Sequence, residues 1–119
     1  MNELIQEVIQ WANDRNIIQG STAIKQLDKT SEEFNELQRA LGQLDILYAL
    51  EDRGLYVNDD LEVAYGDAVD AYGDILVTLI ISAHMQGITL EHALNAAWLQ
   101  IKDRRGELRN GKFVKESDL

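Results

Sequence analysis

The 119-residue chain contains no proline, and this absence constrains its fold more than any other feature. Proline inside a helix removes a backbone donor and clashes with the preceding turn, so a chain without proline can form helices without interruption. Glycines stand mainly where elements are expected to end, for example at Gly20, Gly54 and Gly87. Both features predict an all-α protein.

Apolar residues recur at helical spacing in four parts of the chain. The expected helices cover residues 2–14, about 21–41, 61–86 and 89–105. Ser21 and Thr89 are expected as N-caps, and Thr30 begins a sequence that also fits a capping box. Gly106 is expected to end the last helix. Short connections predict a four-to-five-helix bundle in one domain, while residues 42–60 fit either a helical extension or a loop.

Two sets of apolar residues are expected to face the core. In the second helix they are Ile24, Leu27, Phe34, Leu37 and Leu41. In the 61–86 helix, the segment 75–81 is apolar around nearly its whole circumference, so burial on most sides is expected.

Composition narrows the class of protein. The formal net charge is −10, and a general nucleic-acid binder needs a basic surface instead, so no nucleic-acid partner is expected. The acidic, amphipathic N-terminus is unlike a signal peptide, and the apolar run at 75–83 is too short to span a bilayer. The chain has no cysteine, which excludes disulfides and thiolate metal sites. These features predict a cytoplasmic protein without a membrane partner.

The second expected helix carries a cluster of acids, Glu32, Glu33 and Glu36. At about 100° per residue, Glu32 and Glu36 lie about 40° apart around the helix axis, and Glu33 and Glu36 about 60° apart. Like charges at this spacing cost a few tenths of a kcal/mol per pair. Because that cost is small, the cluster fits a solvated acidic face as well as a binding site.

A second acidic cluster lies on the 61–86 helix, where the sequence Ala-Tyr-Gly-Asp occurs twice within eleven residues. Asp67, Asp70 and Asp74 lie within about 60° of one another on such a helix. Gly66 and Gly73 each cost about 1 kcal/mol of helix stability in a helix interior. We therefore expect them to serve a purpose, such as the close approach of a neighbouring helix or a ligand.

The position of Asp74 directly before the apolar segment 75–81 favours a metal site. A carboxylate there is expected to be poorly solvated, and an unpaired buried charge is costly. Few basic residues lie nearby in sequence, so a divalent cation is the expected partner. All candidate ligands are oxygens, and neither His84 nor His92 stands in a Glu-x-x-His pattern, which favours Mg²⁺ or Mn²⁺ over zinc or di-iron.

The order of these motifs resembles the MazG-like all-α nucleoside triphosphate pyrophosphohydrolases of bacteria and bacteriophages. The first motif is Glu32-Glu33-Phe34-Asn35-Glu36, preceded by Lys29. The second runs from Asp70 to Val77, and the segments 97–106 and 110–116 are also similar to members of this family. The family usually has Glu-x-x-Asp in the second motif, whereas this chain has Ala71 at the Glu position and an acid one residue earlier, at Asp70.

The resemblance implies hydrolysis of a nucleoside triphosphate, and we expect a deoxynucleoside triphosphate, between the α and β phosphates. One or two Mg²⁺ ions would neutralise the triphosphate and activate a water. The implied ligands are Glu33, Glu36, Asp70 and Asp74. Glu32 is expected to be a further ligand or the base that orients the water, and Asp67 a reserve ligand. Bridging cations would also explain how an acidic protein binds a polyanion.

Basic and aromatic residues supply candidates for substrate binding. Six of the eleven basic residues fall between Lys102 and Lys115, and Lys102 and Arg105 are the first candidates for contacts to the leaving pyrophosphate. Cations near a helix C-terminus also simply complement its dipole. Trp11 can stack on a base, although tryptophan at apolar helical spacing more often belongs to a core. The Asn110-Gly111 pair predicts either a hairpin or a partner-binding arm in the tail.

Two classes of function remain open from sequence. The leading hypothesis is the Mg²⁺-dependent pyrophosphohydrolase, and the alternative is a non-enzymatic helical oligomerisation or adaptor module. In either case a homodimer or homotetramer is expected, because a small helical unit often pairs through such a helix. Tyr65 and Tyr72 lie seven residues apart on one face and suit either a subunit contact or the flank of a site.

Overall fold

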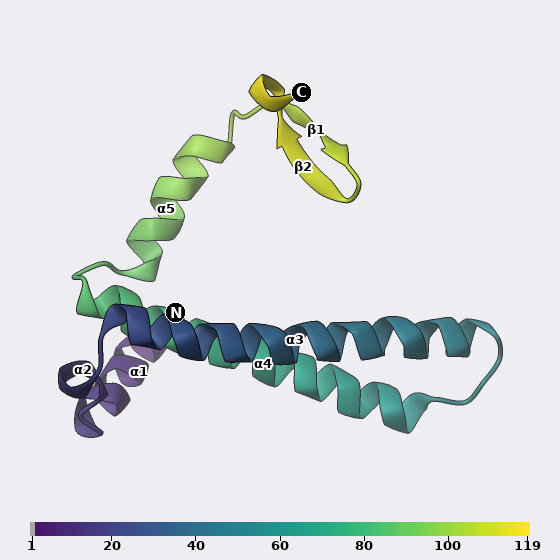
Figure 1. Ribbon diagram of the computed structural model, residues 1–119, viewed down its shortest axis with the longest axis horizontal. Helices are drawn as coiled ribbons and strands as arrows, with labels where there is room; N and C mark the ends of the chain where they lie inside the picture. Colours follow the sequence, from purple (N-terminus) through teal and green to yellow (C-terminus); the bar gives the residue numbers. More distant parts are fainter. Residues whose placement is uncertain (1) are drawn as a thin grey trace. The chain divides into compact units, whose positions relative to one another are not determined.

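The computed structural model describes residues 2–119 and confirms an all-α protein, with one small β-hairpin near its C-terminal end (Figure 1). The described residues form five α-helices, two strands and a short 3-10 helix. The chain divides into two compact units, Met1–Gly87 and Ile88–Leu119, which are described separately.

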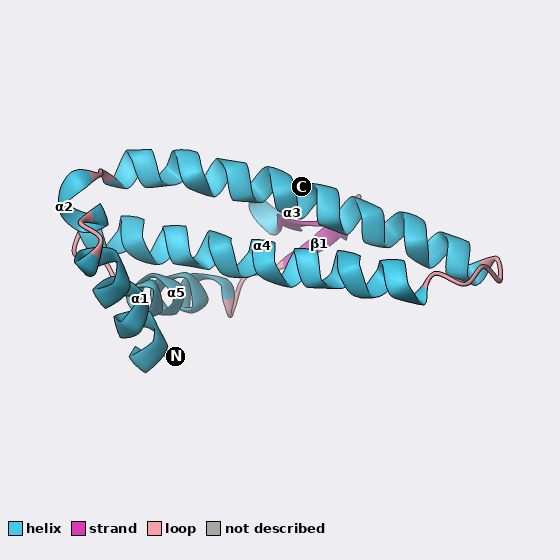
Figure 2. Ribbon diagram, turned by 90° about the horizontal axis from the view of Figure 1, so that it is seen from below, coloured by secondary structure: helices cyan, strands magenta, loops and turns pink. Residues whose placement is uncertain are grey.

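The first unit is built on a pair of long helices, α3 (Ala23–Asp52) and α4 (Asn58–Met85). They run antiparallel and lie side by side in both views (Figures 1 and 2). A short helix α2 (Ile17–Gly20) precedes α3, and α1 (Asn2–Asp14) packs against α4. The predicted 2–14 helix is confirmed.

The seam between α3 and α4 follows a repeat of alternating four and three residues. On α3 the buried positions are Glu33, Leu37, Ala40, Leu44 and Leu47, and on α4 they include Ala64, Ala68, Ala71 and Thr78. This spacing is that of helices packed nearly parallel or antiparallel with interlocking side chains. Three of the α4 positions are alanine, and small side chains let the two backbones approach closely.

Hydroxyl groups fix the register of the pair near the N-terminal end of α3. The hydroxyl oxygens of Thr30 and Thr78 lie at hydrogen-bond distance, 2.7 Å apart, and the Thr78 hydroxyl oxygen also lies 2.8 Å from the Ile75 carbonyl oxygen. The Ser82 hydroxyl donates to the Ala23 carbonyl at 3.0 Å. These contacts join residues 48 and 59 positions apart in sequence, so they define how α4 lies along α3.

The start of α3 differs from its predicted caps. Thr22, one residue after the predicted Ser21, is the N-cap, and its side chain accepts a hydrogen bond from the Lys25 N–H at 3.2 Å. The capping box at Thr30 is wrong, since Thr30 lies inside the helix and donates to the Gln26 carbonyl at 3.0 Å. The segment 42–60 extends α3 to Asp52, and the residues 58–60 begin α4 rather than forming a loop. Acidic Asp59 and Asp60 suit that position because they complement the helix dipole.

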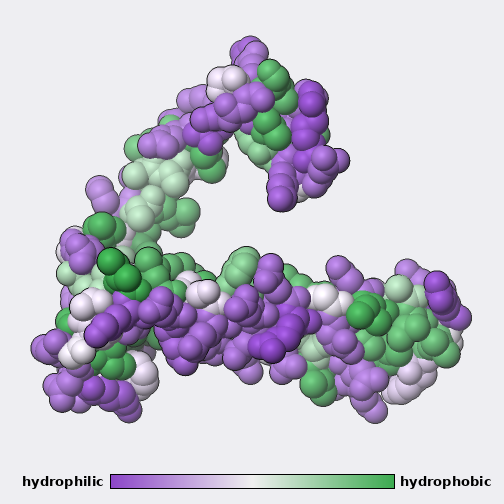
Figure 3. Space-filling model, in the orientation of Figure 1, coloured by the Kyte–Doolittle hydropathy of each residue, from purple (hydrophilic) through white to green (hydrophobic). Residues whose placement is uncertain are grey.

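Several residues predicted for the core are at the surface instead. Of the five apolar positions expected to face inward on α3, only Leu37 is buried, whereas Phe34 is 51% exposed. The physical reason is that α3 has a second apolar stripe, which includes Leu37, and this second stripe is the one that packs against α4. The segment 75–81 fits its expectation better, because Thr78, Ile80 and Ile81 are buried and only Leu76 is exposed, at 49%. Figure 3 shows hydrophobic residues at the surface of both units.

One described helix, α4, is long and apolar enough to cross a membrane by length and composition, with a mean hydropathy of 1.3 over 18 residues. Core helices of soluble proteins pass the same test. Aspartates interrupt this helix, and its partner α3 carries the acidic cluster, which together favour water over lipid as the surroundings of the pair.

The second unit contains α5 (Leu90–Ile101), the strands β1 (Gly106–Arg109) and β2 (Lys112–Lys115), and the 3-10 helix η1 (Glu116–Asp118). Thr89 caps α5 as predicted, accepting from the His92 N–H at 3.1 Å. The helix ends at Ile101, earlier than expected, and Gly106 opens β1 instead of ending a helix. The hairpin alternative for the tail is confirmed. Asn110 and Gly111 both have positive φ, 53° and 78°, as a tight turn between antiparallel strands requires.

Candidate functional site

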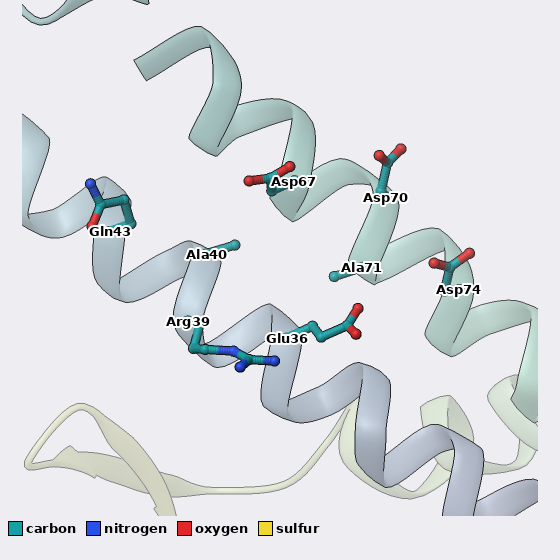
Figure 4. Close-up of a pocket in the computed structure, with 8 residues that line it drawn as sticks. All are labelled: Glu36, Arg39, Ala40, Gln43, Asp67, Asp70, Ala71 and Asp74. Carbon is teal, nitrogen blue, oxygen red and sulfur yellow. The ribbon is translucent and has the colours of Figure 1, made fainter. Parts of the chain in front are cut away.

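An acidic groove runs along one flank of the α3–α4 pair. Its volume is about 590 Å³, and its lining residues are Glu36, Arg39, Ala40, Gln43, Asp67, Asp70, Ala71 and Asp74. Figure 4 shows Ala40 and Ala71 facing one another between the helices, with the acidic side chains of α4 and of Glu36 around them. Four predicted site residues, counting Asp67, are therefore brought to one groove by two helices.

Glu33 is the unusual acid of the site. It occupies a seam position of α3, is only 9% exposed, and its Oε2 atom is buried without a hydrogen-bond partner among the described residues. Burial raises the pKa of Glu33 above its ordinary value, and the neighbouring carboxylates of Glu36 and Asp74 raise it further, while Lys29 opposes them. A buried carboxylate that lies beside other acids is costly unless a proton or a cation neutralises its charge.

The buried acid is thus on α3 rather than on α4, which corrects the expectation for Asp74. Asp74 is exposed, because its position is off the seam, toward the groove. Glu33 lies one turn before Leu37 in the seam repeat, and the alternating four-and-three spacing of 33, 37, 40, 44 and 47 is the sequence pattern that could have identified it.

A second cavity of the first unit is lined by Trp11 together with some of the predicted acids. Its volume is about 690 Å³. It is lined by residues of α1, the α2 region, α3 and α4, among them Trp11, Arg15, Lys25, Lys29, Glu32, Glu33, Asp74 and Thr78. The structure therefore places Trp11 in one cavity with three of the predicted catalytic acids.

The cavity combines an aromatic surface with positive charge. The guanidinium of Arg15 lies 4.6 Å from the centre of the Trp11 ring, a cation–π contact. The Lys29 ammonium lies 3.1 Å from Glu32, and this ion pair is exposed. The carboxylate of Glu32 raises the pKa of Lys29, so the lysine stays charged at neutral pH. Sequence reasoning missed Arg15 and Lys25, because nothing in their local sequence relates them to acids far along the chain.

The two basic residues predicted for phosphate contacts lie in the second unit. Lys102 is the C-cap residue of α5, and Arg105 directly precedes β1, where its carbonyl accepts from the Glu116 N–H at 2.8 Å. Both side chains are exposed. Their role toward phosphate stays a prediction.

The predicted metal ligands are divided between the groove and the Trp11 cavity, with Asp74 lining both, and they do not form a closed coordination shell. Within residues 2–119, no three Asp, Glu or His side chains lie close enough together to hold one metal ion. The donor chemistry nevertheless fits a hard cation, because Glu33, Glu36, Asp70 and Asp74 supply only oxygens. The unpartnered Oε2 of Glu33 is the atom that such a cation would satisfy.

Comparisons with known proteins identify no family. No protein-family model matches the chain, and no solved structure matches it. Over 37 residues the chain is 49% identical to an uncharacterized 18.2 kDa protein in the rep-hol intergenic region of Haemophilus phage HP1 (strain HP1c1). This similarity covers 31% of the chain and 23% of the phage protein, and the phage protein's name states no activity.

Proposed function

We propose that the protein is a Mg²⁺-dependent nucleoside triphosphate pyrophosphohydrolase of the MazG-like all-α type, acting on a deoxynucleoside triphosphate in the cytoplasm. The observation that carries the proposal is Glu33, a buried carboxylate with an unpartnered oxygen beside the acids of a second helix. Selection for stability alone disfavours such a group. A site that binds a cation explains it.

The metal would be held by Glu33 and Glu36 from α3 together with Asp70 and Asp74 from α4. Bound Mg²⁺, or Mn²⁺ in its place, supplies charge neutralisation for the triphosphate and lowers the pKa of a coordinated water. Because the register of α3 against α4 is fixed by the Thr30–Thr78 contact, the two halves of the ligand set are held on a rigid support.

Glu32 has the position of a base. It lies in the same cavity as Glu33 and Asp74, yet its side chain is exposed and paired with Lys29 rather than buried. A solvent-accessible carboxylate next to the metal ligands can orient a water and accept its proton as the water attacks phosphorus.

The Trp11 cavity is the proposed binding place for the nucleotide. The Trp11 ring offers a stacking surface for the base, and Arg15, Lys25 and Lys29 supply positive charge for phosphate oxygens. Glu32, Glu33 and Asp74 line the same cavity, so a triphosphate bound there would reach these three acids. Lys102 and Arg105 remain candidates for contacts to the leaving pyrophosphate.

The proposal is tested by offering the purified protein canonical and modified nucleoside triphosphates with Mg²⁺ and with Mn²⁺. The expected products are the nucleoside monophosphate and pyrophosphate in equal amounts. Formation of the diphosphate and orthophosphate would contradict cleavage between the α and β phosphates. No turnover of any nucleotide with either metal would contradict the enzymatic proposal itself.

The alternative, a non-enzymatic helical oligomerisation or adaptor module, is favoured by one separate observation. Large apolar side chains such as Phe34, Tyr72 and Leu76 are half exposed on the long helices. A surface of this kind is typical of a protein that binds another protein. The nucleotide assay distinguishes the two proposals, because turnover of any nucleotide would exclude the non-enzymatic alternative.

A further inference from the structure

We infer that Arg39 binds the pyrophosphate part of a nucleoside triphosphate in the acidic groove, while the nucleoside part lies in the Trp11 cavity. The inference rests on the proposed function, because it assigns a substrate contact within the same site. Arg39 is not among the candidates that the sequence indicates, and the groove is what draws attention to it.

The Trp11 cavity and the acidic groove follow one another along one flank of the helix pair. The α3 side chains on this flank alternate four and three residues apart, and they are Lys25, Lys29, Glu32, Glu36, Arg39 and Gln43. The α4 side chains have the same spacing, and they are Asp67, Asp70, Asp74, Val77 and Ile81. This spacing keeps each set on one side of its helix. Because Asp74 lines both cavities, they form one path along the pair.

The acids lie in the middle of this path, with basic residues on either side of them. On α3, Lys25 and Lys29 precede Glu32 and Glu36, and Arg39 follows them. At a rise of 1.5 Å per residue, Lys29 and Arg39 are about 15 Å apart along the helix axis. A triphosphate cleaved beside the acids has its nucleoside on one side of them and its pyrophosphate on the other, so the path offers positive charge to both parts.

Arg39 is the one basic residue among those that line the groove. Four carboxylates line the same groove, yet within residues 2–119 the Arg39 guanidinium forms no ion pair. Figure 4 shows Arg39 beside Glu36 on α3, with the three aspartates on the neighbouring helix α4. With Glu36, Asp70 and Asp74 committed to a cation, as proposed, the guanidinium is free to bind an anionic oxygen.

The chemistry of a guanidinium suits a pyrophosphate group. Its planar fork can donate two parallel N–H bonds to phosphate oxygens, and it stays charged at any pH in which the protein is folded. In the proposed reaction the water oxygen bonds to the α phosphorus, the bridging P–O bond breaks, and its electron pair leaves with pyrophosphate. One proton of the water passes to Glu32, and the other stays on the new phosphate oxygen. A guanidinium beside the leaving group stabilises the charge that develops there.

The test compares how the two products inhibit turnover by the wild type and by Arg39→Gln. The inhibition constant of pyrophosphate should rise about tenfold or more in the variant, as expected for the loss of charge-assisted hydrogen bonds. The inhibition constant of the nucleoside monophosphate should stay near that of the wild type. Arg39 is exposed, so the helical circular dichroism spectrum should not change.

Two further variants separate the fork from the charge and from general electrostatics. Arg39→Lys keeps the charge without the planar fork and should recover only part of the affinity for pyrophosphate. Arg53→Gln is the matched control, an exposed arginine at the C-cap of α3 that does not line the groove, and it should leave pyrophosphate inhibition unchanged.

Three results would overturn the inference. The first is unchanged pyrophosphate inhibition in Arg39→Gln, and the second is equal weakening of both products, which would mean that Arg39 acts only through the net charge of the site. The third is a loss of pyrophosphate inhibition in Lys102→Gln or Arg105→Gln but not in Arg39→Gln, which would place the contact in the second unit.

Calorimetric binding of pyrophosphate to the full chain in the presence of Mg²⁺ separates this inference from the proposed function, because it needs no turnover. The wild type should bind pyrophosphate, and Arg39→Gln should bind it about tenfold more weakly. If the wild type binds in this way but hydrolyses no nucleotide, the proposed function fails and the role of Arg39 in binding stands. If the wild type hydrolyses nucleotides and both proteins bind pyrophosphate equally, the inference alone fails. No binding to the wild type would overturn the inference as well.

Discussion

The two flanks of the α3–α4 pair differ in their side chains, which are acidic on one flank and apolar on the other. On the acidic flank, Glu36 and Asp74 line a groove, and α1 contributes Trp11 to the adjoining cavity. The other flank carries large apolar side chains, and among them Phe34 and Tyr72 are exposed within the chain. One helix pair thus carries both a groove lined by acids and a set of exposed apolar side chains.

The largest expected effect concerns the acidic flank. Glu36→Gln or Asp74→Asn removes a proposed metal ligand without changing side-chain size, and turnover should fall by about 10³-fold or more, since a metal stabilises transition-state charge by several kcal/mol. The helical circular dichroism spectrum should stay the same, since both side chains are exposed. Steady-state pyrophosphate release measures the effect.

Glu62→Gln is the matched control, an exposed acid of α4 that does not line the groove. It should retain near wild-type turnover. If Asp74→Asn also retains near wild-type turnover, the ligand assignment on α4 is wrong, and the acidic flank is not a catalytic site as proposed.

The next effect concerns the base-stacking surface. Trp11→Ala should raise KM for the nucleotide about tenfold or more, since stacking on an aromatic side chain contributes about 1–3 kcal/mol per base, and kcat should change less. Trp98→Ala is the control, because Trp98 is an equally large, exposed residue of α5. A larger KM effect at Trp98 than at Trp11 would place the base elsewhere.

For the buried acid Glu33, substitution is expected to stabilise the protein rather than to impair it. The pKa of Glu33 is raised above 4.5, so its contribution to stability is fully present below that pH and is lost as the pH rises through the raised value. Glu33→Gln should therefore be more stable than wild type at pH 7 without metal, and this advantage should shrink as the pH falls toward 4.5. Denaturant unfolding at several pH values tests this, with Glu32→Gln as the exposed neighbour for comparison.

The smallest expected effect concerns the contact that sets the helix register. Thr78→Val removes a buried hydroxyl that bonds Ile75 and contacts Thr30, and should cost about 1–2 kcal/mol in the free energy of unfolding. Ser31→Ala, an exposed substitution one residue from Thr30, should stay within about 0.5 kcal/mol of wild type. Equal effects of both would mean that the threonine contact does not hold the pair.

Much of the fold could be predicted from local sequence, and one central feature could not. Thr89 as a cap and Gly87 after α4 follow from local chemistry, and both are found, with Gly87 at a φ of 70°. The choice between the Leu37 stripe and the Phe34 stripe as the seam could not be predicted, because both satisfy the helical period. That choice depends on which face meets α4, and its misassignment also hid the burial of Glu33.

The acids of the candidate site could be predicted from the sequence, but the residues that surround them could not. Glu36, Asp70 and Asp74 line one groove, as the spacing of acids on two helices suggested. The contribution of Arg15 and Lys25 depends on how the chain folds back over α3, which no local pattern encodes.

The central claim, that Glu33 and its neighbours form a cation site, is tested most directly by the effect of Mg²⁺ on thermal unfolding. Mg²⁺ should raise the unfolding midpoint of the wild-type chain, since a ligand that binds only the folded state stabilises it, and should raise that of Glu33→Gln much less. An equal shift in both proteins, or no shift in wild type at millimolar Mg²⁺, would contradict the claim.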